Sequence, residues 1–143
     1  LDRFALLLAP GEVELTTRIT TTTPVAHDAN GIVTVLLNLL INAYKYTGRD
    51  KRISLRAFED GNEVVLEVED NGIGIPAGDR KRIFEPFFRS DNRLRATSSG
   101  AGLGLAISRA VVAAHRGTIE ARSGDDGGTI MTVRLPPAPE DSP

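Results

Sequence analysis

Hydrophobic and polar positions along the chain follow two periods, and these predict the secondary structure. Alternation among β-branched residues over 12–20 predicts a strand. Residues 31–47 are apolar at helical spacing, follow the candidate capping residues Asp28 and Asn30, and stop near Gly48, as expected for a long helix. The remaining predicted elements are a hairpin over 52–70 that turns at Asp60-Gly61-Asn62, a short helix within 78–88, a glycine-rich basic loop over 89–104, a helix over 103–115 and a second hairpin over 117–136.

This order of elements predicts a two-layer α+β sandwich. The sheet is expected to be mostly antiparallel, with the helices on one face and the loops gathered at one edge. On the first helix, the expected core stripe is Ile32, Val33, Leu36, Leu40 and Ala43. We expect a single domain over 1–136 and a disordered tail over 137–143. Because the chain starts in mid-pattern at "LDRFALLLAP", we also expect it to be a piece of a longer protein.

Composition excludes several classes of function but does not identify one. A net charge of −2 gives no overall field that would attract nucleic acid or an anionic membrane. The absence of cysteine excludes disulfides and thiolate metal sites, and two histidines are too few for a histidine metal cluster. No apolar run approaches the length of a membrane span.

The long helix carries the first candidate chemistry. Asn38, Asn42, Lys45 and Tyr46 fall on one helical face, and the two asparagines interrupt an otherwise apolar run. Buried amides need hydrogen-bond partners, so the asparagines can be explained by contacts with neighbouring backbone. Alternatively, one amide oxygen suffices for a Mg²⁺ that keeps most of its water and phosphate ligands. Both interpretations remain open on the helix alone.

Asp70 and the glycines after it form the second candidate. The strand ends at Asp70, and Gly72 and Gly74 follow within "DNGIGIP". A carboxylate accepts hydrogen bonds and so would select the amino group of adenine over the carbonyl oxygen of guanine. Aspartate before glycine is also a common turn signal, which is the simpler explanation. The run "GAGLGLAIS" leads into a helix and offers backbone N–H groups to an anion, although flexible loops are glycine-rich as well.

Together these segments resemble the catalytic, ATP-binding domain of sensor histidine kinases. The segments "NLLINAYKYT", "DNGIGIP", "IFEPFFR", "GAGLGLAIS" and "GGTIMTVRLP" stand in that family's order over roughly 12–136. The resemblance implies the Bergerat fold, which the kinases share with gyrase, mismatch-repair and heat-shock-chaperone ATPases. It also implies ATP and Mg²⁺ as ligands and a mobile lid over about 88–104.

The resemblance assigns roles residue by residue. Asn42 corresponds to the Mg²⁺ ligand, with Asn38 lining the same site, and Lys45 to a phosphate contact. Asp70 corresponds to the acid that reads adenine, helped through water by the hydroxyl of Thr129. Arg89 resembles a phosphate-facing arginine, so Asn42, Lys45 and Arg89 are the implied catalytic residues. The other implied nucleotide contacts are Tyr46, Gly72, Gly74, Ile75, Phe88, Gly100, Gly102, Leu103, Gly104 and Leu105, and the implied lid anchor is the phenylalanine box Phe84, Phe87 and Phe88.

The implied activity is that of a protein-histidine kinase in two-component signalling. No segment resembles the phosphoacceptor box, so the acceptor histidine and its dimerisation helices are expected outside this chain, and the fragment is expected to be a monomer. A response regulator is the implied downstream partner. The implied location is the cytoplasm, where ATP is found. The resemblance leaves open whether the parent protein is anchored in a membrane. Hydrolytic relatives carry Glu at the position of Asn38, so slow hydrolysis is expected. Met131 also replaces a usual aromatic residue.

Two alternatives remain at this point. One is an anti-sigma-type serine kinase on the same fold, although those relatives tend to carry Glu at position 38 and lack "FEPFFR". The other is a module that binds adenine nucleotides without catalysis and relays shape to a partner. Dependence of ATP binding on Mg²⁺ would distinguish the second alternative from a kinase.

Overall fold

The computed structural model of this protein describes residues 13–20, 29–48, 50–88, 104–124 and 127–137. Within these ranges the order of elements agrees with the prediction. The elements are β1 (Val13–Ile19), α2 (Ala29–Tyr46), β2 (Lys51–Asp60), β3 (Glu63–Asp70), the 3-10 turns η1 (Ala77–Asp79) and η2 (Arg82–Phe84), α3 (Gly104–Ala114), β4 (Thr118–Ser123) and β5 (Thr129–Leu135).

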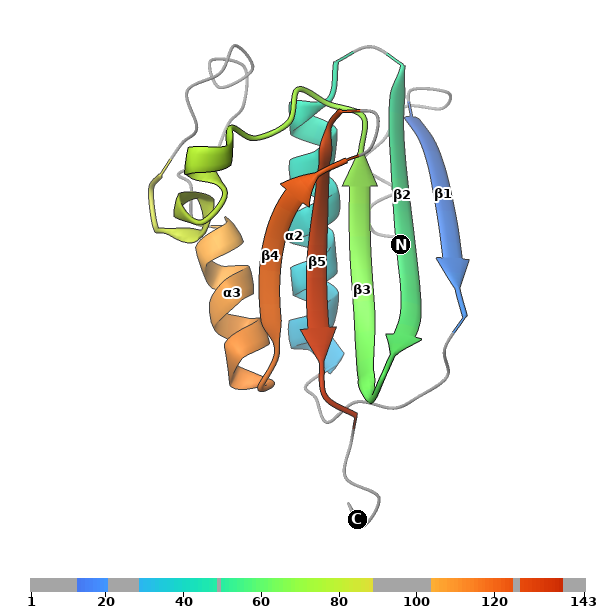
Figure 1. Ribbon diagram of the computed structural model, residues 1–143, viewed down its shortest axis with the longest axis vertical. Coiled ribbons are helices and arrows are strands. Elements are labelled where there is room, and N and C mark those ends of the chain that lie inside the picture. Colours follow the sequence, from blue (N-terminus) through green and yellow to red (C-terminus); the bar gives the residue numbers. More distant parts are fainter. Residues whose placement is uncertain (1–12, 21–28, 49, 89–103, 125–126, 138–143) are drawn as a thin grey trace.

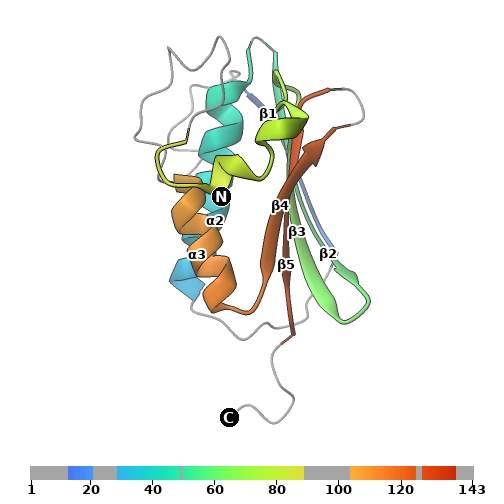
Figure 2. The ribbon, with the colours of Figure 1, turned by 60° about the vertical axis from the view of Figure 1, so that its left-hand side comes forward.

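The strands form one sheet, in the order β1-β2-β3-β5-β4 (Figure 1). β1 pairs with β2 in parallel, whereas the other three pairings are antiparallel. Both helices lie on the same face of this sheet, so that the molecule has one helical layer and one sheet layer (Figure 2). The predicted two-layer α+β sandwich is therefore confirmed.

The core lies between the helices and the inner face of the sheet. Its α2 stripe differs from the predicted one, because Val35 and Leu39 are buried whereas Val33 is exposed. The apolar stripe thus extends further around the helix toward Asn38 and Asn42 than the pattern suggested. The buried members of the core cluster are Val35, Leu39, Leu40, Ala43, Ile53, Leu55, Val68, Ile83, Phe84, Val112, Met131, Val133 and Leu135.

One local prediction is wrong, and another is tested only in part. The segment 78–88 does not form an α-helix but two 3-10 turns, closed by bonds from Asp79 N to Pro76 O (2.8 Å) and from Glu85 N to Arg82 O (2.9 Å). A segment this short, bounded by Pro76 and Pro86, offers too few propagating hydrogen bonds to offset helix nucleation. Asn30 lies in the first turn of α2, which begins at Ala29, so it is not the cap, and Asp28 lies outside the described residues.

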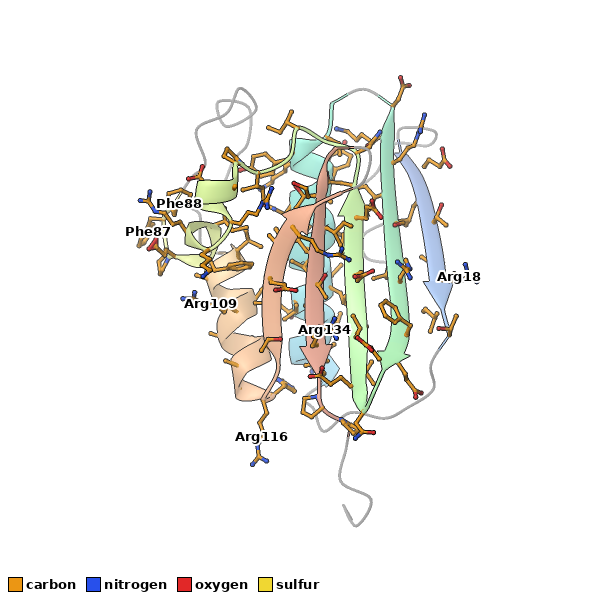
Figure 3. All side chains as sticks on the ribbon, viewed as in Figure 1. Arg18, Phe87, Phe88, Arg109, Arg116 and Arg134 are labelled. Atoms are coloured by element: carbon orange, nitrogen blue, oxygen red, sulfur yellow. The ribbon has the colours of Figure 1, made fainter. Side chains whose placement is uncertain are left out.

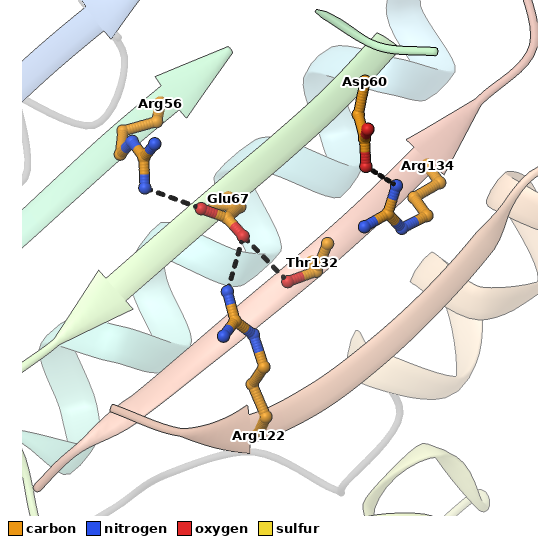
Figure 4. Close-up of polar contacts among 6 residues, drawn as sticks. All are labelled: Arg56, Asp60, Glu67, Arg122, Thr132 and Arg134. Carbon is orange, nitrogen blue, oxygen red and sulfur yellow. Dashed lines mark hydrogen bonds and ion pairs between the residues drawn. The ribbon is translucent and has the colours of Figure 1, made fainter. Parts of the chain in front are cut away.

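The outer face of the sheet carries an ion-pair network centred on Glu67 (Figure 4). Its carboxylate accepts from Arg56 on β2 (3.0 Å), from Arg122 on β4 (2.9 Å) and from the Thr132 hydroxyl on β5 (3.4 Å). The Glu67 side chain is only 7 % exposed, so these partners compensate for removing its charge from water. The network links four of the five strands on the side of the sheet that the helices leave uncovered.

Candidate functional site

Several element ends meet at one edge of the sandwich, at the top of Figure 1. α2 and β3 end there, and β2 and β5 begin there. Asp70, the last residue of β3, pairs directly with Thr129, the first residue of β5. The turn after β3 contacts the end of α2, since Ile73 N donates to the Tyr46 carbonyl oxygen (3.4 Å). The fold therefore brings the candidate residues Tyr46, Asp70 and Thr129 to the same edge.

The Asp70 carboxylate is fixed by backbone donors. Gly72 N donates to its Oδ1 (2.8 Å), and the Thr129 backbone N–H also donates to the carboxylate. Burial raises the pKa of Asp70 from 3.8 to about 6, because the cost of desolvating the charge outweighs these two hydrogen bonds. Asp70 is thus mostly ionised at neutral pH and able to accept a further hydrogen bond.

The two glycines after Asp70 have structural reasons of their own. A Cβ on Gly72 would collide with the carbonyl oxygen of Tyr46, so this position requires glycine for the turn to approach the end of α2. Gly74 has φ +77°, a conformation that side chains disfavour. Gly72 thus has a structural role in the contact between the turn and the helix, independent of any ligand.

Asn38 joins the two helices. Its Nδ2 donates to the Gly104 carbonyl oxygen (3.3 Å) and to Ser108 Oγ (3.2 Å) on α3. Ser108 is fully buried, so this amide satisfies a hydroxyl that has no access to water. The structural explanation of Asn38, left open by the sequence, therefore has direct support.

Asn42 lies one turn further along the same face. It is half-buried, and within the described part of the chain its side chain has no hydrogen-bond partner. That part of the chain also contains no cluster of three or more His, Cys, Asp or Glu residues that would hold a metal on its own. A single amide oxygen, that of Asn42, fits Mg²⁺, which takes few protein ligands when a nucleotide supplies phosphate oxygens.

The comparisons with known proteins agree with this arrangement. Residues 27–139 match the family described as histidine kinase-, DNA gyrase B- and HSP90-like ATPase. The chain belongs to this family. Its predicted resemblance to the catalytic domain of sensor histidine kinases is confirmed.

Relatives within the family are sensor kinases. The sensor protein KdpD of Escherichia coli (strain K12) is 44 % identical over 102 residues, which are 71 % of this chain and 11 % of that protein. The solved structure of the mycobacterial sensor histidine kinase MprB has a TM-score of 0.82 at 30 % identity and covers 96 % of this chain and 91 % of its own. Full-length ShkA in complex with AMPPNP has a TM-score of 0.78 at 29 % identity and covers 99 % of this chain and 30 % of its own.

The three phenylalanines of "IFEPFFR" differ in burial, and Figure 3 labels two of them, Phe87 and Phe88. Phe84 is buried in the core, and Phe88 packs against the core with the Arg82 guanidinium 4.6 Å from its ring centre. Phe87 between them has φ 65° and is 69 % exposed. Phe84 and Phe88 thus anchor this segment, whereas Phe87 points away from the core.

Some predicted family residues lie outside the described residues. These are Arg89, Gly100, Gly102 and Leu103, with most of the predicted lid. Gly104 begins α3, and Leu105 and Ile75 are partly buried against the core. The roles of all these residues in nucleotide binding stay predictions, as do the predicted domain limits and the tail.

Sequence reasoning missed two polar residues that shape this edge. Asn71 lies within "DNGIGIP" and received no role from the sequence, yet its Oδ1 accepts from Arg52 N (2.8 Å) and its Nδ2 donates to Asp50 O (2.9 Å). Lys51 gave no signal at all, although its Nζ contacts the end of α2. The Asn in "DNG" was the available clue for Asn71, whereas the contacts of Lys51 depend on how β2 packs against α2.

Proposed function

We propose that this chain binds Mg·ATP and transfers the γ-phosphoryl group to a histidine on another segment of its parent protein. An imidazole nitrogen would attack the γ-phosphorus, the bond from that phosphorus to the β,γ-bridging oxygen would break, and ADP would leave with the electron pair. The observation that carries the proposal is the Asp70 carboxylate, fixed by two backbone N–H groups at the edge where α2 ends. ShkA, a structural relative, has been solved with the ATP analogue AMPPNP, which supports the same ligand here.

Asp70 would read the base. Its ionised carboxylate would accept a hydrogen bond from the adenine amino group, and Thr129, paired with Asp70, would support it through a water molecule. Tyr46 would pack against the ring from the end of α2, with Gly72 and Gly74 bordering the same pocket. A guanine would present a carbonyl oxygen to this carboxylate and would be rejected.

The phosphate end would be formed by Asn42, Lys45 and Arg89. Asn42 would hold Mg²⁺ through its amide oxygen, and the ion would neutralise charge on the phosphates. Lys45 and Arg89 would bind the phosphate oxygens, and the lid glycines Gly100, Gly102 and Gly104 would offer backbone N–H groups. Asn38 donates to Gly104 and Ser108 and, being an amide, cannot take a proton from water. We therefore expect slow ATP hydrolysis.

The partners and the location follow from this reaction. The acceptor is a histidine on the dimerisation helices of the parent kinase, and a response regulator would receive the phosphoryl group in turn. No described helix has the length and apolar character that crossing a bilayer requires. We place the domain in the cytoplasm because ATP is available there. The names of its relatives favour a sensor kinase over a serine kinase or a non-catalytic module.

A calorimetric titration tests the proposal. The protein would be titrated with a non-hydrolysable ATP analogue with and without Mg²⁺, and with the matching GTP analogue as the control. We expect binding that is strengthened by Mg²⁺ and absent for the GTP analogue. Binding that ignores Mg²⁺ would contradict the metal role of Asn42, and equal binding of GTP would contradict the base-reading role of Asp70.

A further inference from the structure

The C-terminal end of α2 is unusually well bonded for a helix end. The last carbonyl groups of a helix have no partners within the helix and need them from elsewhere. Here the Tyr44 carbonyl accepts from Thr47 Oγ1 (3.1 Å) and from Lys51 Nζ (3.1 Å), and the Tyr46 carbonyl accepts from Ile73 N. The end of α2 is therefore held by β2 on one side and by the turn after β3 on the other.

Lys51, the first residue of β2, makes most of these bonds. Besides Tyr44 O, its Nζ donates to Thr47 O (2.6 Å) and Thr47 Oγ1 (3.3 Å). The same ammonium group lies 4.7 Å from the centre of the Tyr44 ring. A cation at this place also interacts favourably with the negative end of the helix dipole. All three N–H donors of the Lys51 ammonium group thus have acceptors at the end of one helix.

Asn71 holds the backbone on both sides of Lys51. Its side chain bonds Asp50 O and Arg52 N, the groups immediately before and after Lys51. Asp50 has φ 55°, a left-handed conformation that aspartate tolerates in turns, and the hydrogen bond from Asn71 to its carbonyl oxygen holds it there. Because Asn71 directly follows Asp70, this clamp connects the backbone of Lys51 with the turn that bears the carboxylate.

We propose that Lys51 is a positioning residue that sets the distance between the two parts of the adenine site. It would fix the last turn of α2, which carries Lys45 and Tyr46, against the Asp70 turn. This inference rests on the proposed function, since it concerns the same nucleotide. Lys51 itself contacts protein groups at the helix end, so its effect on the ligand is exerted through Tyr46 and Asp70.

A helix cap that only adds stability is the competing explanation, and three variants separate the two. Lys51→Met keeps the length of the side chain and removes the charge and the donors. Lys51→Arg keeps both. Arg52→Met is the matched control, because Arg52 is an exposed cation on the same strand and only its backbone N–H takes part in the clamp.

Affinities for ADP and for the non-hydrolysable ATP analogue would be measured by calorimetry, well below the unfolding temperature of each variant. For Lys51→Met we expect both affinities to fall by the same factor, about tenfold, the effect of losing a charged hydrogen bond. Lys51→Arg should recover most of the loss, and Arg52→Met should match the wild type. In the nucleotide-free Lys51→Met protein, the NMR amide signals of Gly72, Ile73 and Gly74 should shift as well.

The outcomes are distinguishable. Wild-type affinity in Lys51→Met, with only a lower melting temperature, would overturn the positioning role and leave the proposed function intact. A wild-type protein that binds no adenine nucleotide would overturn the proposed function and this inference with it. If Lys51→Met does not fold, Lys51→Gln, which keeps an N–H donor without the charge, replaces it with the same expected direction and the same control.

Discussion

The two ends of the proposed nucleotide site differ in how much of their bonding capacity the protein itself uses. At the Asp70 end, the carboxylate, the Asn71 amide and the Tyr46 carbonyl all have protein partners. At the phosphate end, the Asn42 side chain has none among the described residues. We infer that the proposed base site is organised before a ligand arrives, whereas the proposed phosphate end leaves the Asn42 amide for the ligand to engage.

Neutralising Asp70 should have the largest effect on nucleotide binding. Asp70→Asn should weaken binding of the ATP analogue by about 2–4 kcal/mol, roughly 30- to 800-fold, because a buried charged acceptor is lost. The Gly72 N–H still finds an acceptor in the amide oxygen of asparagine, so the fold should persist. Calorimetry gives the affinity, and circular dichroism checks the fold. Wild-type affinity in this variant would show that Asp70 does not read adenine.

Substituting Asn42 tests the proposed phosphate end of the site. Asn42→Ala should remove the strengthening of ATP binding by Mg²⁺, a loss of about ten- to thirtyfold, while ADP binding changes less. The reason is that the amide oxygen is the one protein ligand proposed for the ion. Titrations of both nucleotides with and without Mg²⁺ measure the effect. An unchanged Mg²⁺ dependence would remove Asn42 from the metal role and would leave the Asp70 end unaffected.

A pH series sharpens the description of the Asp70 end. Because the pKa of Asp70 is raised to about 6, affinity for the ATP analogue should be highest above pH 6 and fall as the carboxyl is protonated. Lowering the pH from 7 to 5 should therefore weaken binding about tenfold. The folding stability of the ligand-free protein depends on pH in the opposite direction. The contribution of Asp70 to folding stability is fully present below its unfolded pKa of 3.8 and is lost as the pH rises through about 6.

The Asp70→Asn variant is the control for this series. Its affinity should respond to pH less than that of the wild type over the same interval, because asparagine does not titrate there and only the phosphate of the nucleotide does. A wild-type protein with the same affinity at pH 5 and pH 7 would contradict the assignment of Asp70 to the base.

Substituting Glu67, on the outer face of the sheet, should have the smallest effect on nucleotide binding. Glu67→Gln should leave nucleotide affinity unchanged, because Glu67 lies on the face opposite the helices (Figure 4). It should lower the free energy of unfolding by about 1–2 kcal/mol, a modest loss because both partner arginines are about half exposed and screened by water. Urea unfolding and calorimetry measure the two quantities. A large loss of affinity would mean that the outer face is coupled to the site.

Much of the fold was predictable because it depends on local patterns. The hairpin of β2 and β3 follows from alternation on both sides of Asp60-Gly61-Asn62, and Gly61 indeed has φ 65°. The order of elements also determines that the helices share a face. The 3-10 turns η1 and η2 were not predictable in the same way, since a short segment between two prolines supports a helical turn of either kind.

The site was predictable where the sequence itself marks it. The strand end at Asp70 agrees with the prediction from sequence, whereas the pairing of Asp70 with Thr129 is a finding of the structure. The contact from Asn38 to Ser108 spans 70 positions along the chain and depends on how α2 and α3 pack, so no local pattern contains it. The bonds of Lys51 have the same origin. The predicted roles in nucleotide binding await the experiments above.

The parallel pairing of β1 with β2 has a consequence for the order of folding. The hairpins β2–β3 and β4–β5 join neighbours in the chain, whereas β1 reaches β2 only after α2 has crossed the sheet. β1 is also an edge strand whose side chains are mostly exposed. We therefore expect β1 to join the sheet last and to exchange its amide hydrogens fastest among the strands. Since β1 contributes no residue to the proposed site, we expect this strand to open without releasing a bound nucleotide.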